Sequence, residues 1–583
     1  MKKIIISLIV FCFVSFTKES LLGKILANQS RVKSSLLIDS LAFYVSPNGH
    51  DSNNGSLNYP FKTLERARDT MRSCTIKTVY LRLGEYARSQ TFILDSNDNG
   101  QKWLNYPGDP INSAILNGNG IQDVIDILGG SDIIIEGLLV KNYTSRGIGV
   151  HGGKGWGNAA PYFNQTYSAA KNNIIRNNIV EAGIVPAPGW DRAGINTQGT
   201  VPNTQIINNV VRNTTGYGIG IWSLQAGDDI SGTEVKNNAL LNTCSTVNDG
   251  AAIYTNDRTA ASTNVLIENN FIRDYGQFAN FVRAVYLDDR ASNTIVRGNI
   301  IAGTGRQPIL LHGGNNNQVT GNIIDIGNSG KMSVLNYAIS GTSTMTGNKF
   351  TGNIIISSYA IDSAGGAYLK TGTVTFPEIK YNYYYNYSTG IVNTGGLFYE
   401  LKDSFPLQGD PKLSGWKYEL SSTSPVFNNP TNFPPIVGHW GPPGYMIPAA
   451  GTAPSSLLPG SSHIYLHAES YASMNGIVKN GISIGSCDNN DWVRFENIDL
   501  SSNHNSFTAR LAVPATHAGQ KVQVRLDSPT GTLIGELTAT DTGGFNNYVE
   551  QSTPLNGGVG IHNIYIVFSG GAGVGNFDYF KFH

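Results

Sequence analysis

The chain has 583 residues, and only 14% of them are charged. Lys plus Arg equal Asp plus Glu at 41 each, so the formal net charge is zero. This balance argues against electrostatic capture of nucleic acid or of a strongly anionic polymer as the main mode of binding. The length exceeds what one ordinary core supports, so we expect several structural units or a repeat architecture that grows by stacking.

The N-terminus has the pattern of a secretory signal peptide. Lys2 and Lys3 precede a short apolar run, residues 4–16, that is too short to span a bilayer. We expect a signal peptide over residues 1–27, and we find no later transmembrane pattern. The mature protein is therefore predicted to be secreted, extracellular or periplasmic, without a membrane span, and monomeric.

One helix is predicted near the start of the mature chain, over residues 63–71. Leu64, Ala67 and Met71 recur at helical spacing, and Thr63 is a suitable N-cap. A lone amphipathic helix placed before a β-rich array is suited to covering the first exposed edge of that array.

An apolar-flanked asparagine recurs between about residues 133 and 356. The asparagines are Asn178, Asn209, Asn238, Asn270, Asn299, Asn322 and Asn353. Subtracting their numbers gives intervals of 23 to 32 residues, which indicates one supersecondary unit per coil of a solenoid. Short β-branched runs joined by Gly, Asn and Asp fill each unit, so the pattern predicts an all-β, right-handed parallel β-helix. We interpret the asparagines as structural, because Asn tolerates left-handed backbone and can bond neighbouring coils.

In the C-terminal third of the sequence the repeat ends, and two further segments of different composition follow. Residues 375–446 lose the period, and we interpret them as the last coils and the C-terminal cap. A Pro- and Ser-rich stretch then predicts a linker, and the last segment has the size and alternation of one β-sandwich (jelly roll). The predicted domains are a β-helix over 41–446, a linker over 447–462 and a β-sandwich over 463–583. Cys74, Cys244 and Cys487 have no metal-ligand spacing and are expected to pack as small apolar residues.

Equivalent positions in neighbouring coils of a parallel β-helix lie about 4.8 Å apart, so aligned coils show which side chains meet. We align residues 220–225, 252–258, 284–290 and 308–314. The alignment predicts an aromatic column of Trp222, Tyr254 and Tyr286 and a polar column of Asn256, Asp288 and His312. It also sets Asp257 beside Asp289 and Arg258 beside Arg290.

Two adjacent carboxylates should split their titrations, which supplies the acid and the base or nucleophile that glycosidic cleavage needs. We therefore predict Asp257 and Asp289 as the catalytic pair, with Asp288 in reserve and Asp249 as an alternative acid. The predicted substrate-binding residues are Trp222, Tyr254, Tyr286, Arg258, Arg290 and His312. The competing interpretation is that the aspartates cap turns or bind a structural cation, that His312 is a turn residue and that the aromatic column only packs. Loops that carry His151 with Trp156, and Trp190, would extend the groove.

The β-helix region resembles known carbohydrate-active families. Residues 43–55 and 60–68 are similar to the N-terminal signature of right-handed β-helix proteins in glycoside hydrolase families 120 and 141. Residues 252–257, 285–289 and 312–314 resemble the active face of family 141-like β-helices, and this resemblance implies acids at Asp257 and Asp289. It does not imply one substrate, since β-helices carry hydrolases, lyases and epimerases.

The C-terminal segment resembles family 6 carbohydrate-binding modules. The similar stretches are residues 465–471, 490–495, 542–545 and 576–580. The resemblance implies a sugar-binding loop site at Phe545 and Asn576 and a structural calcium held by Glu469 and Asp578. Two departures are that Ser486 stands where an aromatic residue is usual, and that Phe545 replaces the commoner tryptophan.

The preferred hypothesis is a glycoside hydrolase that cleaves a polysaccharide and needs no cofactor for catalysis. A polysaccharide lyase or uronate epimerase is the alternative, with His312 or Arg290 as base and often a calcium ion. The third hypothesis is a non-catalytic surface protein in which both domains only bind glycans.

Overall fold

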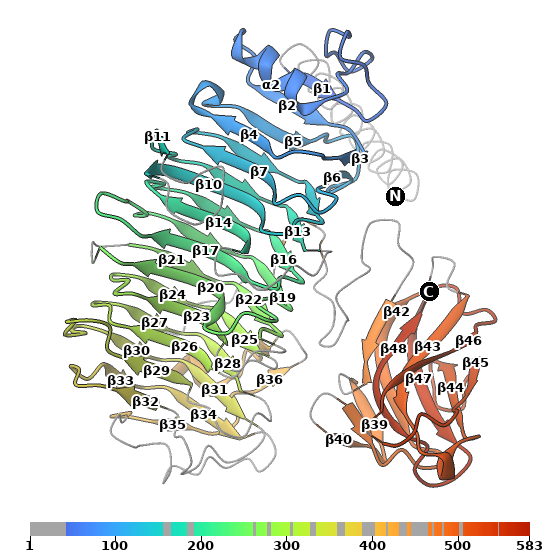
Figure 1. The fold of residues 1–583 in the computed structure, drawn as a ribbon. Helices are drawn as coiled ribbons and strands as arrows, with labels where there is room; N and C mark the ends of the chain where they lie inside the picture. The colour runs from blue at the N-terminus through green and yellow to red at the C-terminus, as the bar shows by residue number, and fades with distance from the viewer. Residues whose placement is uncertain are drawn as a thin grey trace, which may run out of the picture.

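The computed structural model describes most of the chain from residue 42 to residue 582 (Figure 1). The described residues are 42–154, 165–182, 192–259, 264–276, 282–302, 307–326, 334–357, 368–386, 403–414, 418–428, 430, 440–443, 445, 464–468, 471–480, 483–500, 505–545 and 547–582. The predicted signal peptide and linker lie outside these residues, as do Trp156, Trp190 and Glu469.

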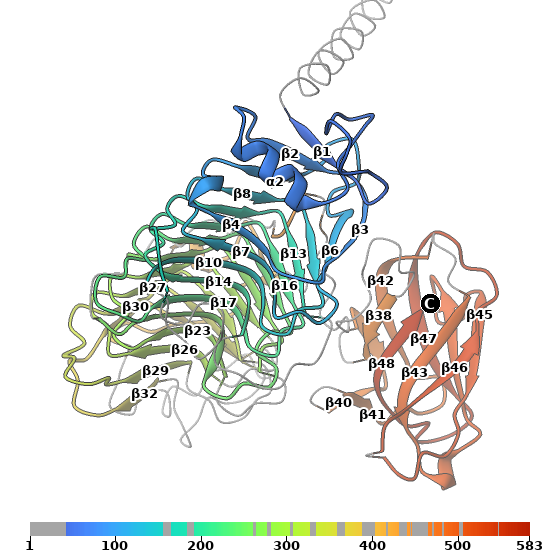
Figure 2. The ribbon, with the colours of Figure 1, turned by 45° about the horizontal axis from the view of Figure 1, so that its top comes forward.

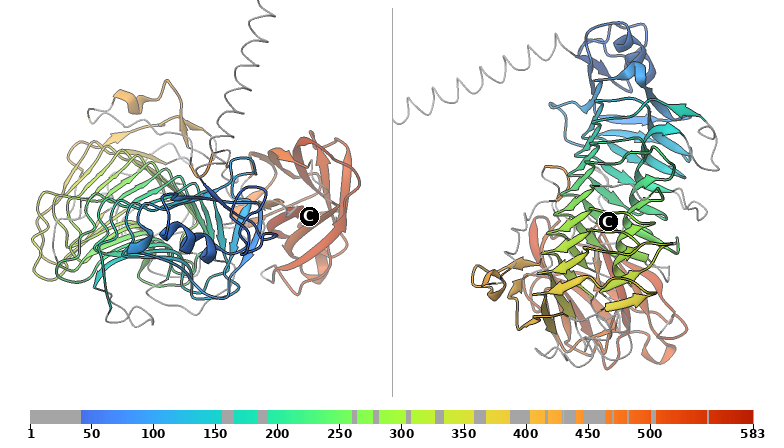
Figure 3. Two further views of the ribbon diagram at one scale, coloured as in Figure 1. Left: turned by 90° about the horizontal axis from the view of Figure 1, so that it is seen from above. Right: turned by 90° about the vertical axis from the view of Figure 1, so that its left-hand side faces the viewer.

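Three long parallel sheets form the first domain, as predicted for a parallel β-helix. Sheet A contains β1 (Phe43–Val45), β2 (Thr78–Leu81), β5 (Lys102–Asn105), β8 (Ile134–Glu136), β12 (Ile174–Arg176), β15 (Gln205–Ile207), β18 (Glu234–Lys236), β21 (Leu266–Glu268), β24 (Ile295–Arg297), β27 (Gln318–Thr320), β30 (Lys349–Thr351) and β33 (Glu378–Lys380). Sheet B contains β3 (Gly84–Ala87), β6 (Ala114–Asn117), β9 (Leu139–Lys141), β13 (Ile179–Glu181), β16 (Val210–Arg212), β19 (Ala239–Leu241), β22 (Phe271–Arg273), β25 (Ile300–Ala302), β28 (Ile323–Asp325), β31 (Ile354–Ser357), β34 (Tyr383–Asn386) and β35 (Leu407–Gln408). Sheet C contains β4 (Phe92–Asp95), β7 (Asp123–Leu128), β10 (Arg146–Lys154), β14 (Ala193–Gly199), β17 (Tyr217–Ser223), β20 (Gly250–Asp257), β23 (Val282–Asp288), β26 (Gln307–His312), β29 (Leu335–Ala338) and β32 (Tyr368–Thr371), and β11 (Thr166–Tyr167) pairs with β10. The strands of successive coils lie one over another along the domain (Figure 3).

Stacked apolar columns fill the interior of the β-helix. In sheet A the middle residue of each strand from β8 to β33 is buried, as with Ile135, Ile175 and Ile206, and its two neighbours are half-buried or exposed. Because side chains alternate between the two faces of a strand, a slip of one residue would turn each column to solvent. Burial of these residues therefore excludes any shift of the register between coils by an odd number of residues.

The predicted helix is present as α2 (Leu64–Arg72) and lies over the N-terminal end of the stack (Figure 2). Leu64, Ala67 and Met71 are buried against the first coils. Thr63 is the N-cap, and its hydroxyl accepts from the backbone N–H of Arg66 at 3.2 Å. The helix covers the apolar end of the core, which the sequence pattern predicted.

The recurring asparagines form a continuous buried ladder of hydrogen bonds. Each one donates its backbone N–H and its Nδ2 to the Oδ1 of the next asparagine; for Asn238 and Asn270 both distances are 3.0 Å. The same pattern runs from Asn178 to Asn382 and closes on the buried carboxylate of Asp403. The structural interpretation of the asparagines is confirmed, but their left-handed backbone lies one residue earlier, as at Asn237 (φ 55°).

A C-terminal segment of the β-helix domain covers the outer face of sheet B. That face is apolar, and its members include Leu139, Ile179, Val210, Phe271, Ile300 and Ile323. Val426, in the 3₁₀ turn η3 (Pro425–Asn428), and Trp440 pack on it; the Trp440 ring lies 5.1 Å from that of Phe271. β36 (Leu413–Ser414) and β37 (Glu419–Leu420) belong to the same segment. The expected terminal cap is thus, in its described part, a cover along one side of the stack.

Two antiparallel sheets form the C-terminal domain. One contains β38 (Ile464–His467), β40 (Val478–Asn480), β41 (Ser483–Gly485), β43 (Ser506–Ala512), β46 (Val549–Pro554) and β48 (Asn576–Phe582), and the other contains β39 (Ser473–Asn475), β42 (Trp492–Asp499), β44 (Lys521–Leu526), β45 (Leu533–Thr538) and β47 (Ile561–Ser569). Phe507, Phe568 and Phe580 are fully buried between the sheets. This is the predicted β-sandwich.

Two further expectations concern cysteines and membranes. Cys244 and Cys487 are free and buried and Cys74 is free and half-buried, in accord with packing as small side chains. Within the described part of the chain, no helix combines the length and the apolar character that crossing a bilayer demands.

Asn270→Ala should destabilise the β-helix, because it removes the acceptor of two buried donors of Asn238. Buried polar groups without partners cost about 1–3 kcal/mol each, so we expect a loss of about 2–4 kcal/mol of unfolding free energy. Chemical denaturation followed by circular dichroism measures this loss. Asn264→Gly is the matched control, because Asn264 is exposed at φ 49° and glycine adopts that conformation freely. Equal stability of Asn270→Ala and the control would contradict the ladder's role.

Candidate functional site

The C-terminal ends of β20, β23 and β26 bring polar residues to one edge of sheet C. The ladder pairs Tyr254 with Tyr286 and Asn256 with Asp288. The next ladder pairs Tyr286 with Leu310, and His312 bonds directly to Asp288. The predicted polar column of Asn256, Asp288 and His312 is therefore present in the predicted register.

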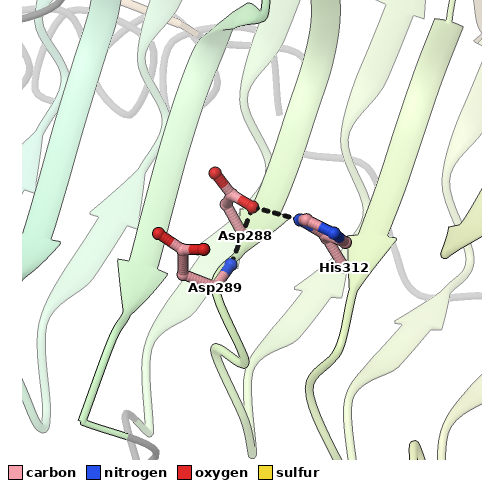
Figure 4. Close-up of side chains that lie close together, drawn as sticks. All are labelled: Asp288, Asp289 and His312. Atoms are coloured by element: carbon pink, nitrogen blue, oxygen red, sulfur yellow. Dashed lines mark hydrogen bonds and ion pairs between the residues drawn. The ribbon is translucent and has the colours of Figure 1, made fainter. Parts of the chain in front are cut away.

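Asp288 is the centre of this cluster (Figure 4). Its Oδ1 accepts from Nδ1 of His312 at 2.5 Å and from the backbone N–H of Asp289 at 2.7 Å. Its Oδ2 accepts from the hydroxyl of Tyr254 at 2.7 Å, and that hydroxyl accepts from Nδ2 of Asn256 at 3.3 Å. Asp288 is only 8% exposed, so its charge is balanced by protein groups rather than by water.

The contacts of Asp288 favour an ion pair with His312. Burial opposes ionisation of Asp288, but the hydrogen bonds from His312 and Tyr254 outweigh it, and the pKa of Asp288 is lowered. The hydrogen bond to Asp288 is the main reason that the pKa of His312 is raised, and a backbone contact with Ile339 acts in the same direction. Burial, followed by the charge of Asp288, raises the pKa of Tyr254 well above its usual value. These shifts favour an anionic aspartate, a protonated imidazole and a neutral phenol.

Asp289 and Arg258 form the accessible rim of the cluster. Nε of Arg258 donates to Oδ2 of Asp289 at 2.8 Å, and the side chains are 47% and 27% exposed. Asp289 (φ 43°) and Arg290 (φ 72°) are consecutive residues in the left-handed region, which is unfavourable for residues other than glycine. This turn directs the Asp289 carboxylate away from the core, and Arg290 donates to the backbone carbonyl of Arg258.

The structure separates Asp257 from this rim. Asp257 has no exposed surface and lies on the same side of β20 as Ile253 and Thr255, which face the interior. Its carboxylate accepts from the hydroxyls of Ser223 at 3.1 Å and Thr259 at 2.6 Å, and burial raises its pKa despite these bonds. The expected open pair of Asp257 and Asp289 is not formed, because Asp257 is buried; the acids that meet are Asp288 and Asp289.

The aromatic column is partly displaced from its predicted register. Trp222 pairs with Asn256, and Gly220 occupies the position beside Tyr254. Trp222 still lies near Tyr254, with ring centroids 6.2 Å apart, because a shift of two residues keeps a side chain on the same face. These rings are 3–6% exposed and form a packed cluster, so in this structure they are not an open platform for a sugar.

Two participants were missed by the alignment. Tyr217 packs against Tyr254 with ring centroids 4.7 Å apart, and Arg283 lies over the Tyr286 ring at 4.7 Å. Arg283 also binds Asp249 at 2.8 Å, which engages the proposed alternative acid in an ion pair. Alternation alone gives Arg283 the parity of the inward-facing Val285, so the sequence pattern did not place it beside Tyr286.

The cluster has the donor set of a cation site. Asp288, Asp289 and His312 each offer a ligand atom, and these atoms lie within 4.8 Å of one another. Carboxylate and imidazole are suitable ligands for several divalent metals. However, Asp288 and His312 already neutralise each other through a direct hydrogen bond, and a metal would have to displace the proton that they share.

The residues predicted for sugar and calcium binding in the C-terminal domain lie on described strands and loops, except for Glu469. Phe545 is 38% exposed, and Nδ2 of Asn576 donates to its carbonyl at 2.9 Å. Asp578 accepts from the guanidinium of Arg510, so a calcium ion at Asp578 would compete with that cation. The calcium site stays a prediction. Ser486 is exposed in the left-handed region at φ 52°.

Comparison with known proteins identifies the C-terminal domain. Residues 467–583 match the model of the carbohydrate binding module (family 6). Endo-1,4-beta-xylanase A of Thermoclostridium stercorarium is 40% identical over 119 residues, which are 19% of this chain and 23% of the xylanase. A family 6 module of Clostridium cellulolyticum in complex with xylose is 34% identical and covers 20% of this chain and 95% of its own, with a TM-score of 0.20. The chain thus spans about a quarter of the xylanase, all of it in the binding module.

For the β-helix, one solved structure overlaps a longer stretch. The A-module of mannuronan C-5 epimerase AlgE6 of Azotobacter vinelandii covers 59% of this chain and 94% of its own, at 13% identity and a TM-score of 0.40. The resemblance to glycoside hydrolase families 120 and 141 stays a prediction.

Asp288→Asn should lower the pKa of His312 toward its ordinary value of about 6.5, because it removes the charge that holds the proton. Because the pKa of Asp288 is lowered in the folded protein, its contribution to stability is lost as the pH falls through that lowered pKa. Because the pKa of His312 is raised in the folded protein, its contribution to stability is lost as the pH rises through that raised pKa. The pair therefore stabilises the fold most in mildly acidic solution. Site-resolved hydrogen exchange of histidine C2–H by mass spectrometry measures the pKa.

His562 is the internal control for this measurement. Its pKa is raised by a hydrogen bond to Asp527 in the other domain, and Asp288→Asn should not change it. An unchanged pKa of His312 in Asp288→Asn would show that the ion pair is not formed in solution.

Proposed function

We propose that this protein is a secreted glycoside hydrolase that cleaves a neutral or weakly charged polysaccharide at the Asp288–Asp289–His312 cluster and holds it with a family 6 module. The observation that carries the proposal is the cluster itself, which sets a partly exposed carboxylate beside an imidazole whose pKa is raised. Glycosidic cleavage needs one group that gives a proton and one that attacks or takes a proton.

In the proposed mechanism His312 is the acid. The hydrogen bond to Asp288 raises its pKa, which favours the protonated form, and its side chain is 29% exposed. It gives its proton to the glycosidic oxygen as the bond from that oxygen to the anomeric carbon breaks. Asp288 does not react, because it is buried out of reach of substrate and its hydrogen bonds favour the anion; it is a positioning residue that orients His312 and favours its protonated form.

Asp289 is the proposed partner carboxylate. It either attacks the anomeric carbon or takes a proton from the water that does so. Arg258 holds it in place through the 2.8 Å contact. The left-handed backbone at Asp289 and Arg290 supports the assignment, because strained conformations concentrate where function needs a side chain in one direction.

The C-terminal module and the N-terminal segment indicate the substrate class and the location. A family 6 module with relatives in a xylanase and in a xylose complex makes xylan the first substrate to test. The charged and apolar N-terminal pattern of residues 1–27 supports secretion. The zero net charge supports a neutral polymer rather than a polyanion.

The direct test is incubation of the purified protein with xylan and a panel of plant, algal and microbial polysaccharides, followed by measurement of released reducing ends. Release from one polymer supports the proposal. A protein that binds glycans but releases no reducing ends from any of them supports the non-catalytic alternative.

Asp289→Asn and His312→Gln should each lower kcat by about 10²–10⁴-fold, the usual contribution of a positioned acid or base. Asp257→Asn should retain activity, because its buried carboxylate reaches no substrate. Asp132→Asn, at an exposed turn remote from the cluster in sequence and sheet, is the matched control. A loss of kcat in Asp257→Asn with an unchanged melting temperature would show that the site is wrongly assigned.

A polysaccharide lyase is the second candidate, and one observation favours it. Arg258 is 47% exposed beside a cluster with a cation-binding donor set, and a lyase needs positive charge to neutralise a uronate. Lyase products contain a carbon–carbon double bond that absorbs ultraviolet light, and hydrolase products do not. Absorbance of the reaction with uronate-containing polymers therefore separates the two reactions.

A further inference from the structure

The loop edge of the C-terminal module brings together three segments, which are residues 487–488, residues 573–576 and Phe545. The backbone N–H of Val574 donates to the carbonyl of Cys487 at 2.7 Å, and the N–H of Gly573 donates to Asp488 at 2.7 Å. Asn576 donates to the carbonyl of Phe545 at 2.9 Å. These bonds hold an exposed aromatic ring among polar loops, which is a suitable surface for a sugar, because sugars offer both C–H faces and hydroxyl groups.

His517 contributes a second ring to this edge. It is the last residue of the 3₁₀ turn η5 (Ala515–His517), between β43 and β44. Its ring centroid lies 5.3 Å from that of Phe545, at an interplanar angle of 52°. A methyl group added at Gly573 would come within 3.1 Å of the imidazole, so the loop backbone lies directly against the ring.

One hydrogen bond fixes the tautomer of His517. Nδ1 lies 3.0 Å from the carbonyl oxygen of Ala572. A carbonyl oxygen only accepts, so Nδ1 carries the hydrogen, and in the neutral ring Nε2 has the free lone pair. No described residue forms a hydrogen bond with Nε2. The ring therefore presents an unused acceptor beside an exposed aromatic face.

Ser486 supplies no ring at the position where the family resemblance leads one to expect an aromatic residue. It is an exposed residue at φ 52° and carries no ring, and the neighbouring Cys487 and Asp488 are joined to the Gly573–Val574 loop that packs on His517. The second ring near Phe545 thus comes from a different loop, and unlike a phenyl ring it can accept a hydrogen bond.

We propose that His517 is a sugar-binding residue of the module: Phe545 packs on the apolar face of the sugar ring, and Nε2 of His517 accepts a hydrogen bond from one of its hydroxyl groups. The inference rests on the proposed carbohydrate-binding role of the module and names the residue that replaces the missing aromatic partner. It gives the site one apolar wall and one wall that selects for a hydroxyl donor.

The experiment uses the full chain and isothermal titration calorimetry with xylohexaose, cellohexaose and laminarihexaose. For the hexaose that binds best, Phe545→Ala should weaken binding strongly. His517→Ala should weaken it about tenfold or more, because both the ring and the acceptor are lost. His517→Phe keeps a ring without the acceptor and should bind about threefold to tenfold more weakly than the wild type.

His562→Ala is the matched control. His562 is also a module histidine bonded to a neighbour, but it lies at the opposite end of β47 from the loop that contacts His517, and its loss should leave affinity unchanged. The melting temperature of every variant establishes that the module is folded.

The outcomes separate this inference from the function on which it rests. If Phe545→Ala loses binding while His517→Ala binds like the wild type, the inference is overturned and the role of the module stands. If His517→Phe binds as tightly as the wild type, the acceptor role is wrong. If the wild type binds none of the three hexaoses, the proposed sugar-binding role of the module fails first.

Discussion

The whole β-helix depends on stacking in register. Parallel strands place equivalent residues of successive coils about 4.8 Å apart. A residue type that recurs at the same position of each coil therefore stacks on identical side chains above and below. Isoleucine and valine columns make the core in this way, and asparagines make a ladder in which each amide satisfies its neighbour. The asparagine ladder specifies the register more strictly than apolar packing does. A shifted asparagine would lose the hydrogen-bond partners of its buried amide, whereas a shifted isoleucine has no hydrogen bonds to lose.

The candidate site follows from the same constraint. Asp288 meets His312 because their coils are adjacent in sheet C, and it meets Tyr254 from the coil on its other side. Three consecutive coils thus surround one buried carboxylate with donors. Its charge is then used to raise the proton affinity of a more exposed imidazole, while Asp289, one residue along, reaches the rim. This division into a buried positioning acid and an accessible partner is the feature on which the proposed chemistry rests.

The two domains offer different kinds of candidate binding surface. The β-helix offers a charged cluster on a rigid sheet edge, suited to positioning reacting groups. The module offers loops, with an exposed ring and hydrogen-bonding groups at Phe545, His517 and Asn576, suited to holding a sugar without reacting with it. Relatives identify the module only, so the proposed chemistry of the β-helix rests on its own side chains.

The sequence by itself determined the β-helix, the capping helix α2, the asparagine column, the sandwich and the meeting of Asp288 with His312. These features were predictable because the length of the coil repeat and the alternation of buried and exposed residues follow directly from residue spacing. Alternation has a period of two, however, so it cannot detect a shift of two residues, and Trp222 was placed opposite Tyr254 instead of Asn256. The same alternation, applied strictly, would have turned Asp257 inward with Ile253. Only the tertiary structure decided that the turn at Asp289 takes a left-handed conformation and brings its carboxylate to Arg258, since that depends on how the chain leaves the strand.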